Sequence, residues 1–345
     1  MSAWSKSDRL AAALAGERAD HPAASAYLHT TSSERTAADL VAATLDFQRK
    51  WDWDWIKLNP RTVHYAEAWG NVYDYDDYPT PLPIPAQRRA AVESPAETWR
   101  LERLRIDEVP QFQEQLQVIR DVVAAEPDTP VFATVYSPLN VFLKIAGLPA
   151  WSGDLDVPGS SSTLRFSDYI AHERAGVHHA LHVIASTLAD YAEAYRRAGA
   201  SGLFFVEASL ANTEFLSEAF FNEFSRPYDA ITLEGGAGLT RVVHTCGGDS
   251  KAPWFEEFPL EGINWDSHDV SNPPIDVELN KTKFVGVSHT LLGGLTSGPL
   301  ADTVKRQVAH ARATLDDRFV LAPSCSIPAH TSDEALSAYR EAALA

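Results

Sequence analysis

The chain has 345 residues, of which 45% are apolar and 22% are charged, and its formal net charge is −18. This is the composition of an ordinary globular protein with a large core, and it excludes a disordered or fibrous chain. The negative charge disfavours nucleic acid and anionic membrane surfaces as partners, because both select clustered Lys and Arg.

Targeting signals and cysteine usage indicate the compartment. No stretch reaches the roughly 18 consecutive apolar residues of a transmembrane helix, and the N-terminus lacks the apolar core of a secretory signal. We therefore expect a cytoplasmic protein. Two cysteines in so long a chain argue against a disulfide framework, so both thiols are free for metal binding or catalysis.

Short apolar, β-branched runs bounded by turn residues predict eight strands, each followed by a polar residue. The predicted strands cover residues 24–28, 55–58, 131–136, 203–206, 240–243, 263–265, 284–287 and 319–322. Helical patterns lie between most of them. The clearest are at residues 37–50, 166–198, 215–233, 299–315 and 332–344.

The alternation of strands and helices predicts a parallel sheet, because parallel strands need crossover connections. We expect a single (β/α)8 TIM barrel that comprises residues 1–345 as one domain. A doubly wound open sheet is the alternative. Against it, no glycine-rich phosphate loop follows any predicted strand.

Two segments depart from this pattern, and a third invites a separate interpretation. Residues 71–94 are rich in Tyr, Asp and Pro and predict an ordered surface excursion or a lid, and residues 151–162 predict a Gly/Ser loop. The alternating run WDWDW at residues 51–55 is interpreted as the edge of the core that leads into the second strand, rather than as a ligand-stacking site.

Polar residues at the carboxyl ends of the predicted strands define the candidate site, because TIM-barrel enzymes carry their active sites at that face. We expect most of these residues to line one pocket. They are His29, Asn59, Tyr136, Glu207, His244, Cys246, Asp266, His289, Ser324 and Cys325.

Both cysteines of the chain belong to this set. Cys246 and Cys325, together with His244, form a group of one imidazole and two thiols from two strand ends. A catalytic zinc ion characteristically has three such protein ligands and an open fourth position. The alternative is that the cysteines are small buried hydrophobic residues. A closed structural zinc site is disfavoured, since paired Cys-x₂₋₄-Cys knuckles are absent.

Two segments carry the most specific family signature. Residues 244–247 (HTCG) and 321–328 (LAPSCSIP) resemble the zinc-binding segments of the methylcobamide:thiol methyltransferases, a branch of the uroporphyrinogen decarboxylase superfamily. Residues 6–17 are similar to the opening helix of this superfamily, and residues 55–60 (WIKLNP) to its second strand. The resemblance spans nearly the whole chain and implies a barrel that binds zinc through the His and the two Cys.

The resemblance also implies a reaction and its partners. It implies a small-molecule thiol as substrate and a methylated corrinoid (cobalamin) as methyl donor. Because the chain lacks a D-x-H-x-x-G cobalamin-binding motif, the donor would arrive free or on a separate corrinoid protein. Asp266 occupies a place comparable to that of a carboxylate zinc ligand in cobalamin-independent methionine synthase, and the superfamily's habit suggests a monomer or a homodimer.

Three functions remain open at this point. The leading hypothesis is a zinc-dependent thiol methyltransferase in which Glu207, Asp266 and His289 act in catalysis and His29, Asn59 and Tyr136 contact the cofactor. The second is a lyase or decarboxylase of a smaller acid. Porphyrinogen decarboxylation itself is disfavoured, because residues 27–32 (YLHTTS) lack the arginine cluster of those enzymes. The third is a corrinoid- or metal-binding accessory protein.

Overall fold

The computed structural model describes residues 4–79, 83–149, 162–294 and 300–345. Residues 151–161 of the predicted Gly/Ser loop and residue 299 of a predicted helix lie outside these ranges.

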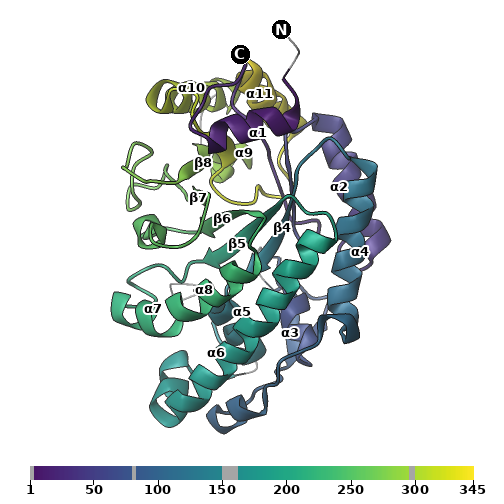
Figure 1. Cartoon of the computed structure of the whole chain (residues 1–345), viewed down its shortest axis with the longest axis vertical. Helices are drawn as coiled ribbons and strands as arrows, with labels where there is room; N and C mark the ends of the chain where they lie inside the picture. The colour runs from purple at the N-terminus through teal and green to yellow at the C-terminus, as the bar shows by residue number, and fades with distance from the viewer. Residues whose placement is uncertain (1–3, 80–82, 150–161, 295–299) are drawn as a thin grey trace.

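A curled sheet of seven parallel strands forms the centre of the molecule (Figure 1). In sheet order the strands are β1 (Ile56–Leu58), β4 (Val131–Tyr136), β5 (Gly202–Ala208), β6 (Thr240–Thr245), β7 (Gly262–Asn264), β8 (Thr282–Val287) and β9 (Val320–Pro323). Every neighbouring pair is parallel. The order in the sheet follows the order in the chain, whereas a doubly wound sheet reverses its strand order at a switch point. The fold is therefore TIM-barrel-like.

The eighth predicted strand, residues 24–28, is not a regular strand. It makes two isolated parallel bridges, to β9 and to the turn after it. The Ser25 N–H donates to the carbonyl of Leu321 (3.1 Å), and the carbonyl of Ala24 accepts from the N–H of Asp54 (2.9 Å). The segment thus contacts both edges of the sheet, β9 and the residues just before β1. The expectation of eight regular strands is corrected to seven, because this segment forms only isolated bridges.

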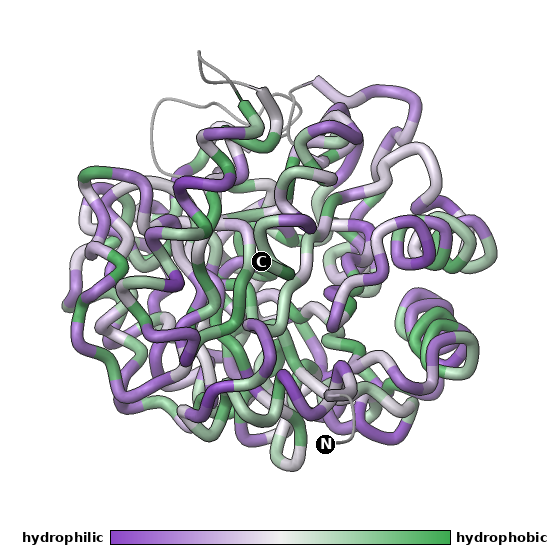
Figure 2. The backbone as a smooth tube through the Cα atoms, turned by 90° about the horizontal axis from the view of Figure 1, so that it is seen from above, coloured by the Kyte–Doolittle hydropathy of each residue, from purple (hydrophilic) through white to green (hydrophobic). Residues whose placement is uncertain are grey.

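Helices follow most strands and surround the sheet. The α-helices are α1 (Lys6–Leu14), α2 (Ala37–Trp51), α3 (His64–Ala68), α4 (Pro110–Ala125), α5 (Pro138–Ile145), α6 (Phe166–Arg197), α7 (Glu218–Phe224), α8 (Arg226–Gly235), α9 (His289–Leu292), α10 (Leu300–Leu315) and α11 (Asp333–Leu344). Short 3₁₀ turns are η1 (Pro95–Arg100), η2 (Ile106–Glu108) and η3 (Ala252–Phe255). In Figure 2, apolar segments gather near the centre, and the peripheral helices alternate between polar and apolar residues.

The helix ends follow local chemistry. Thr36 caps α2 by accepting the N–H of Asp39, and Ser332 caps α11 by accepting the N–H of Ala335. The single helix predicted at 215–233 is two helices, α7 and α8, separated at Ser225. Pro227 occupies the first turn of α8, where its missing N–H costs no helical hydrogen bond.

Aromatic side chains fill the interior of the curled sheet. The ring of Trp55 packs edge-on against Phe132 (5.2 Å between centroids) and Phe284 (5.7 Å), and it stacks on Phe204 (6.2 Å). Because side chains alternate along a strand, Lys57 is expected on the same interior side as Trp55. Its ammonium indeed lies over the ring of Phe204.

The described residues of the predicted excursion, 71–79 and 83–94, contain a small sheet of their own. Within it, β2 (Val72–Asp74) and β3 (Ala86–Arg89) pair as a two-stranded antiparallel sheet. The Arg35 guanidinium donates to Asp76 (2.7 Å), and the Tyr78 hydroxyl donates to the Glu34 carboxylate (3.0 Å). These contacts attach the excursion to the loop before α2.

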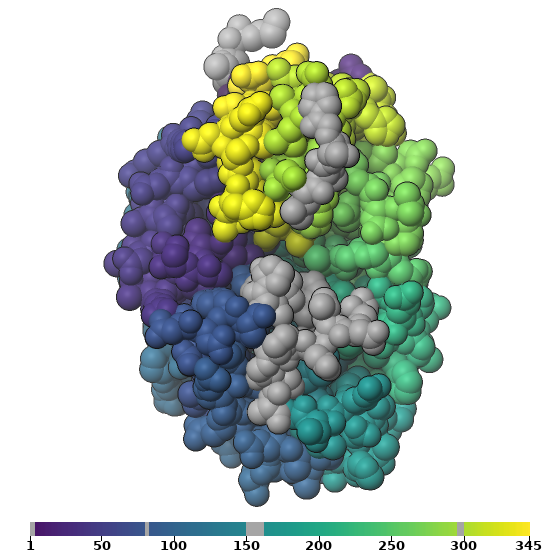
Figure 3. Space-filling model, turned by 180° about the vertical axis from the view of Figure 1, so that it is seen from behind, coloured from purple at the N-terminus to yellow at the C-terminus, as the bar shows by residue number. Residues whose placement is uncertain are grey.

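The two ends of the chain lie at the same end of the molecule (Figure 1). Figure 3 shows the yellow C-terminal surface adjacent to the purple and blue N-terminal surface, and Lys50 of α2 pairs there with Asp333 of α11 (2.7 Å). Among the described helices, none combines the length and the apolar character that crossing a membrane requires.

Candidate metal centre

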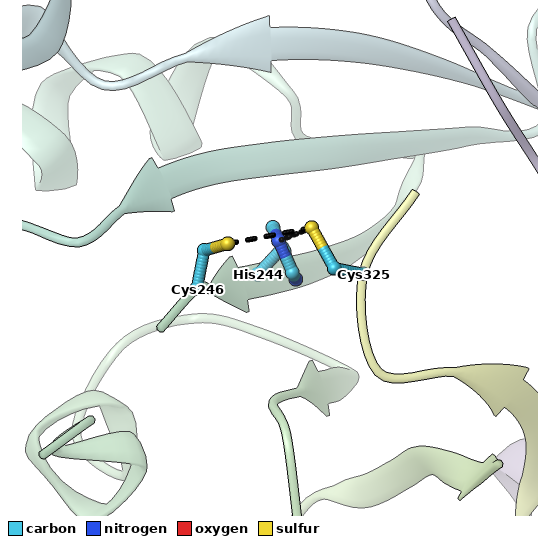
Figure 4. Close-up of side chains that lie close together, drawn as sticks. All are labelled: His244, Cys246 and Cys325. Carbon is cyan, nitrogen blue, oxygen red and sulfur yellow. Dashed lines mark hydrogen bonds between the residues drawn. The ribbon is translucent and has the colours of Figure 1, made fainter. Parts of the chain in front are cut away.

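Three side chains from two strand ends converge at the carboxyl end of the sheet (Figure 4). His244 lies near the end of β6, Cys246 follows this strand, and Cys325 comes two residues after β9. The two sulfur atoms are 3.3 Å apart, and the Sγ of Cys325 is 3.5 Å from Nε2 of His244. One donor atom from each residue lies within 4.8 Å of the others. The structure thus brings together the three residues that the sequence predicted as metal ligands.

Asn264, at the end of β7, orients His244. Its side-chain nitrogen donates to the backbone carbonyls of Phe284 and Pro323, so its oxygen must be the atom that faces His244. That oxygen lies 2.5 Å from Nδ1 of His244, which must therefore carry the proton. The lone pair of the imidazole is then on Nε2, which faces Cys325. This is the tautomer that a metal-ligating histidine uses.

The donor set fits zinc. A tetrahedral zinc ion bonded at about 2.3 Å to sulfur and about 2.1 Å to nitrogen holds two sulfurs about 3.8 Å apart and a sulfur and a nitrogen about 3.6 Å apart. The distances found are 3.3 Å between the sulfurs and 3.5 Å between Cys325 and His244. The second distance matches this geometry, and the sulfur–sulfur distance is about 0.5 Å shorter than the ideal value. Two thiolates and one imidazole are also the ligand types that zinc prefers.

The two thiols differ in acidity. The hydrogen bond from Cys246 holds the pKa of the Cys325 thiol well below its usual range, and His244 and His289 act in the same direction. The same contact raises the pKa of the Cys246 thiol. One thiolate therefore forms readily, and the thiolate is the form of cysteine that binds metals.

The predicted cofactor-contacting residues lie around this cluster. Asn59, just past β1, donates to the hydroxyl of Ser326 (3.3 Å), the residue after Cys325. Burial lowers the pKa of the His29 imidazole to about 3 and the charge of Lys57 acts in the same direction, so this imidazole is neutral at pH 7. Burial raises the pKa of Tyr136, and the thiols of Cys325 and Cys246 add to the effect.

Asp266 and His289 form a second group beside the cysteines. The Oδ2 atom of Asp266 is 3.8 Å from Nδ1 of His289, which also lies 2.8 Å from the hydroxyl of Ser324. Among the described residues, Asp266 is not part of the group whose donor atoms lie within 4.8 Å of one another. Its carboxylate is therefore a neighbour of the cluster in this conformation rather than a member of it.

Glu207 lies elsewhere. It is fully buried, and its carboxyl accepts a hydrogen bond from Ser225 (2.8 Å), whose hydroxyl also faces Asp229 of α8 (2.9 Å). Glu207 lies at an irregularity of β5, where the pairing with β6 shifts between Val206 and Ala208, and there its carboxyl faces the helices. The structure does not bring Glu207 into the group of candidate ligands.

Two residues of the site were missed by the sequence analysis. Asn264 is the last residue of β7. A search that included the final residue of each strand, and not only the residues after it, would have found this asparagine. Lys57 sits inside β1, only 7% exposed, where a lysine among apolar residues is itself a signal. Two histidines of α6 lie outside the cluster: His178 contacts Tyr228 and Glu223, and His179 contacts the carbonyl of Leu101.

The fold and the cluster define a class: a TIM-barrel-like protein with a thiolate-rich candidate metal centre at the carboxyl ends of its strands. The chain belongs to the uroporphyrinogen decarboxylase (URO-D) family, whose model matches residues 5–344. This match confirms the resemblance to the uroporphyrinogen decarboxylase superfamily.

Solved structures share the fold. The chain is similar to a methyltransferase from Methanosarcina mazei, with 18% identity, a TM-score of 0.71 and coverage of 98% of both chains. It is also similar to a B12-independent methionine synthase from Shewanella sp. W3-18-1 in complex with selenomethionine, with 16% identity, a TM-score of 0.56 and coverage of 88% of this chain and 86% of the other. At these identities the likeness establishes the fold. A comparison with curated proteins gives no match.

Proposed function

We propose that this protein is a zinc-dependent methyltransferase that transfers a methyl group to the sulfur of a small-molecule thiol, with a methylated corrinoid as donor. The observation that carries the proposal is the convergence of His244, Cys246 and Cys325 within 4.8 Å, with the imidazole held in the metal-binding tautomer. The names of the two solved relatives, a methyltransferase and a methionine synthase, support methyl transfer as the reaction class.

The metal would be held by the imidazole Nε2 of His244 and the sulfurs of Cys246 and Cys325, with a fourth position left for the substrate. Zinc in such a site supplies a substrate thiol in its deprotonated, nucleophilic form at neutral pH. In the reaction a sulfur–carbon bond forms, the bond between the methyl group and its donor breaks, and the electron pair of that bond leaves with the donor.

The side chains of this protein perform the remaining tasks. Asn264 holds the imidazole of His244 in its orientation and tautomer through the 2.5 Å contact to Nδ1. Asp266 and His289, 3.8 Å apart, accept the proton that the thiol releases. His29, Asn59 and Tyr136 surround the cluster and contact the substrate or the donor. Because the chain has no cobalamin-binding motif of its own, the donor comes from solution or from a separate corrinoid protein.

Metal content is the first test. Protein purified without chelators should contain about one equivalent of zinc, and Cys246→Ser, Cys325→Ser and His244→Ala should each lose most of it. His178→Ala, which changes a helical histidine outside the cluster, is the matched control and should keep its zinc. Wild-type protein that contains no zinc, and takes up none on titration, would contradict the proposal.

The reaction is the second test. Zinc-loaded protein incubated with methylcobalamin and a panel of thiols should change the corrinoid absorption spectrum and yield the methyl thioether, which mass spectrometry detects. If zinc is present but no thiol changes the corrinoid, a decarboxylase or lyase that uses the same centre to polarise a carboxylate becomes the favoured function.

A further inference from the structure

A lysine lies inside the barrel close to the cysteine cluster. Lys57 belongs to β1, and its side chain enters the interior of the sheet, where it is 7% exposed. Its Nζ lies 4.6 Å from the ring centroid of Tyr27 and 4.7 Å from that of Phe204. Aromatic faces attract cations, so the two rings favour the charged form of the side chain.

The ammonium has few polar partners. Nζ donates to the side-chain oxygen of Asn59 (2.6 Å), and among the described residues none of its contacts is to a carboxylate. A buried cation is costly unless an opposite charge compensates it. The opposite charges that act on Lys57 are those of Cys325 and Cys246, which oppose the lowering of its pKa to about 7 by burial.

Hydrogen bonds connect Lys57 to the cysteine loop. An ammonium can only donate, so it fixes the oxygen of the Asn59 amide toward itself. The amide nitrogen then points the other way, to the carbonyl of Leu28 (3.0 Å) and the hydroxyl of Ser326 (3.3 Å). Ser326 follows Cys325 in the chain, so the orientation of the Asn59 amide affects the position of the loop that carries this thiol.

We propose that Lys57 is a positioning residue for thiol binding: its buried ammonium balances the negative charge that a substrate thiolate adds to the cysteine cluster, and it orients Asn59 against the Cys325 loop. This inference rests on the proposed metal centre and deepens it. Two cysteine thiolates already balance the double charge of zinc, so a third thiolate leaves one negative charge in a site of low polarity. The nearby ammonium stabilises that state more than the substrate-free state.

The test measures thiol binding rather than turnover. Wild type and Lys57→Met are loaded with Co²⁺, whose thiolate charge-transfer absorption reports each sulfur ligand, and are titrated with 2-mercaptoethanol, a thiol with no other charge. Lys57→Met is expected to bind one equivalent of Co²⁺ as wild type does but to bind 2-mercaptoethanol roughly tenfold more weakly. Lys57→Gln keeps an N–H donor for Asn59 and loses only the charge, so its thiol affinity is expected to fall between the two.

Lys283→Met is the matched control. Lys283 is a half-buried lysine of β8 whose Nζ donates to the carbonyl of Ile275 (2.9 Å), so it lacks the connection to the cysteine loop. The Lys283→Met substitution should leave the affinity for 2-mercaptoethanol unchanged. Wild-type thiol affinity in either folded Lys57 variant, or an equal loss in Lys283→Met, overturns the inference. Failure of wild type to bind Co²⁺ or zinc would instead overturn the proposed function, so the two failures are distinguishable.

Discussion

The contact between Asn264 and His244 is the most consequential single-residue feature of the site. The Asn264 amide nitrogen donates to two backbone carbonyls, so its oxygen is left to accept from the imidazole and from the hydroxyl of Tyr27. An imidazole without this acceptor can rotate or adopt the other tautomer. The metal-binding geometry therefore depends on a residue that does not itself offer a ligand atom.

Asn264→Ala should weaken zinc binding by about 10- to 100-fold, because the partner that fixes the tautomer of a metal-ligating histidine is lost. Competition with a chromophoric chelator measures the affinity. Thermal unfolding in the presence of a chelator separates this effect from simple destabilisation. A variant that is less stable but binds zinc as tightly as wild type would show that Asn264 acts in folding alone.

At the scale of elements, β5 and α8 meet through a buried pair of acids. Glu207 and Asp229 are both fully buried and share the single hydroxyl proton of Ser225. Ser137 is a second hydrogen-bond partner of Glu207, and it is the burial of both acids that favours a protonated form. Burial raises the pKa of Glu207 to about 8 and also raises the pKa of Asp229, to which the charge of Glu207 contributes.

This pair predicts a loss of stability toward alkaline pH. The folded-state pKa of Glu207 is raised above its ordinary value of 4.5, so between about pH 4.5 and 8 the folded protein binds a proton that the unfolded chain has released. Stability from this group is fully present below pH 4.5 and is lost as the pH rises to 8. In Glu207→Gln the decrease in unfolding free energy between pH 5 and 8 should be smaller than in wild type. Urea denaturation at several pH values measures it, and identical pH profiles would contradict the prediction.

At the scale of the whole molecule, one buried carboxylate connects both ends of the chain. Asp54 is fully buried and pairs with Arg9 of α1 (3.0 Å) and Arg340 of α11 (3.7 Å). It also accepts the N–H of Ala24 (2.9 Å), in the segment that contacts both edges of the sheet. Asp54 therefore holds together the region where the sheet approaches closure.

Asp54→Ala should lower the free energy of unfolding by about 2 kcal/mol, because it removes a buried charged acceptor and leaves Arg9 and Arg340 with only their more exposed partners, Asp20 and Asp52. Asp54→Asn keeps an acceptor for Ala24 and should lose less. Urea denaturation gives both values. Asp46→Ala, at an exposed position of α2, is the control. A loss in Asp54→Ala no larger than that of the control would show that the pair contributes little.

The sequence by itself determined the position of most elements. Periodicity and capping are local properties, so the strand predicted at 131–136 has those bounds, and the helix predicted at 37–50 ends one residue later. The types and places of the three candidate ligands were also readable, because residues that follow parallel strands meet at one face. In the WDWDW run, Trp53 and Trp55 are buried as the alternation predicts.

Only the tertiary structure decided which way several side chains point and what they meet. Asp54 is buried like its tryptophan neighbours, because two arginines from the far ends of the chain reach it. Glu207 faces the helices at a point where the pairing of β5 with β6 shifts between Val206 and Ala208. The partners of His244 and Lys57 likewise come from distant strands. Such contacts depend on sheet register and closure, which no local pattern in the sequence encodes.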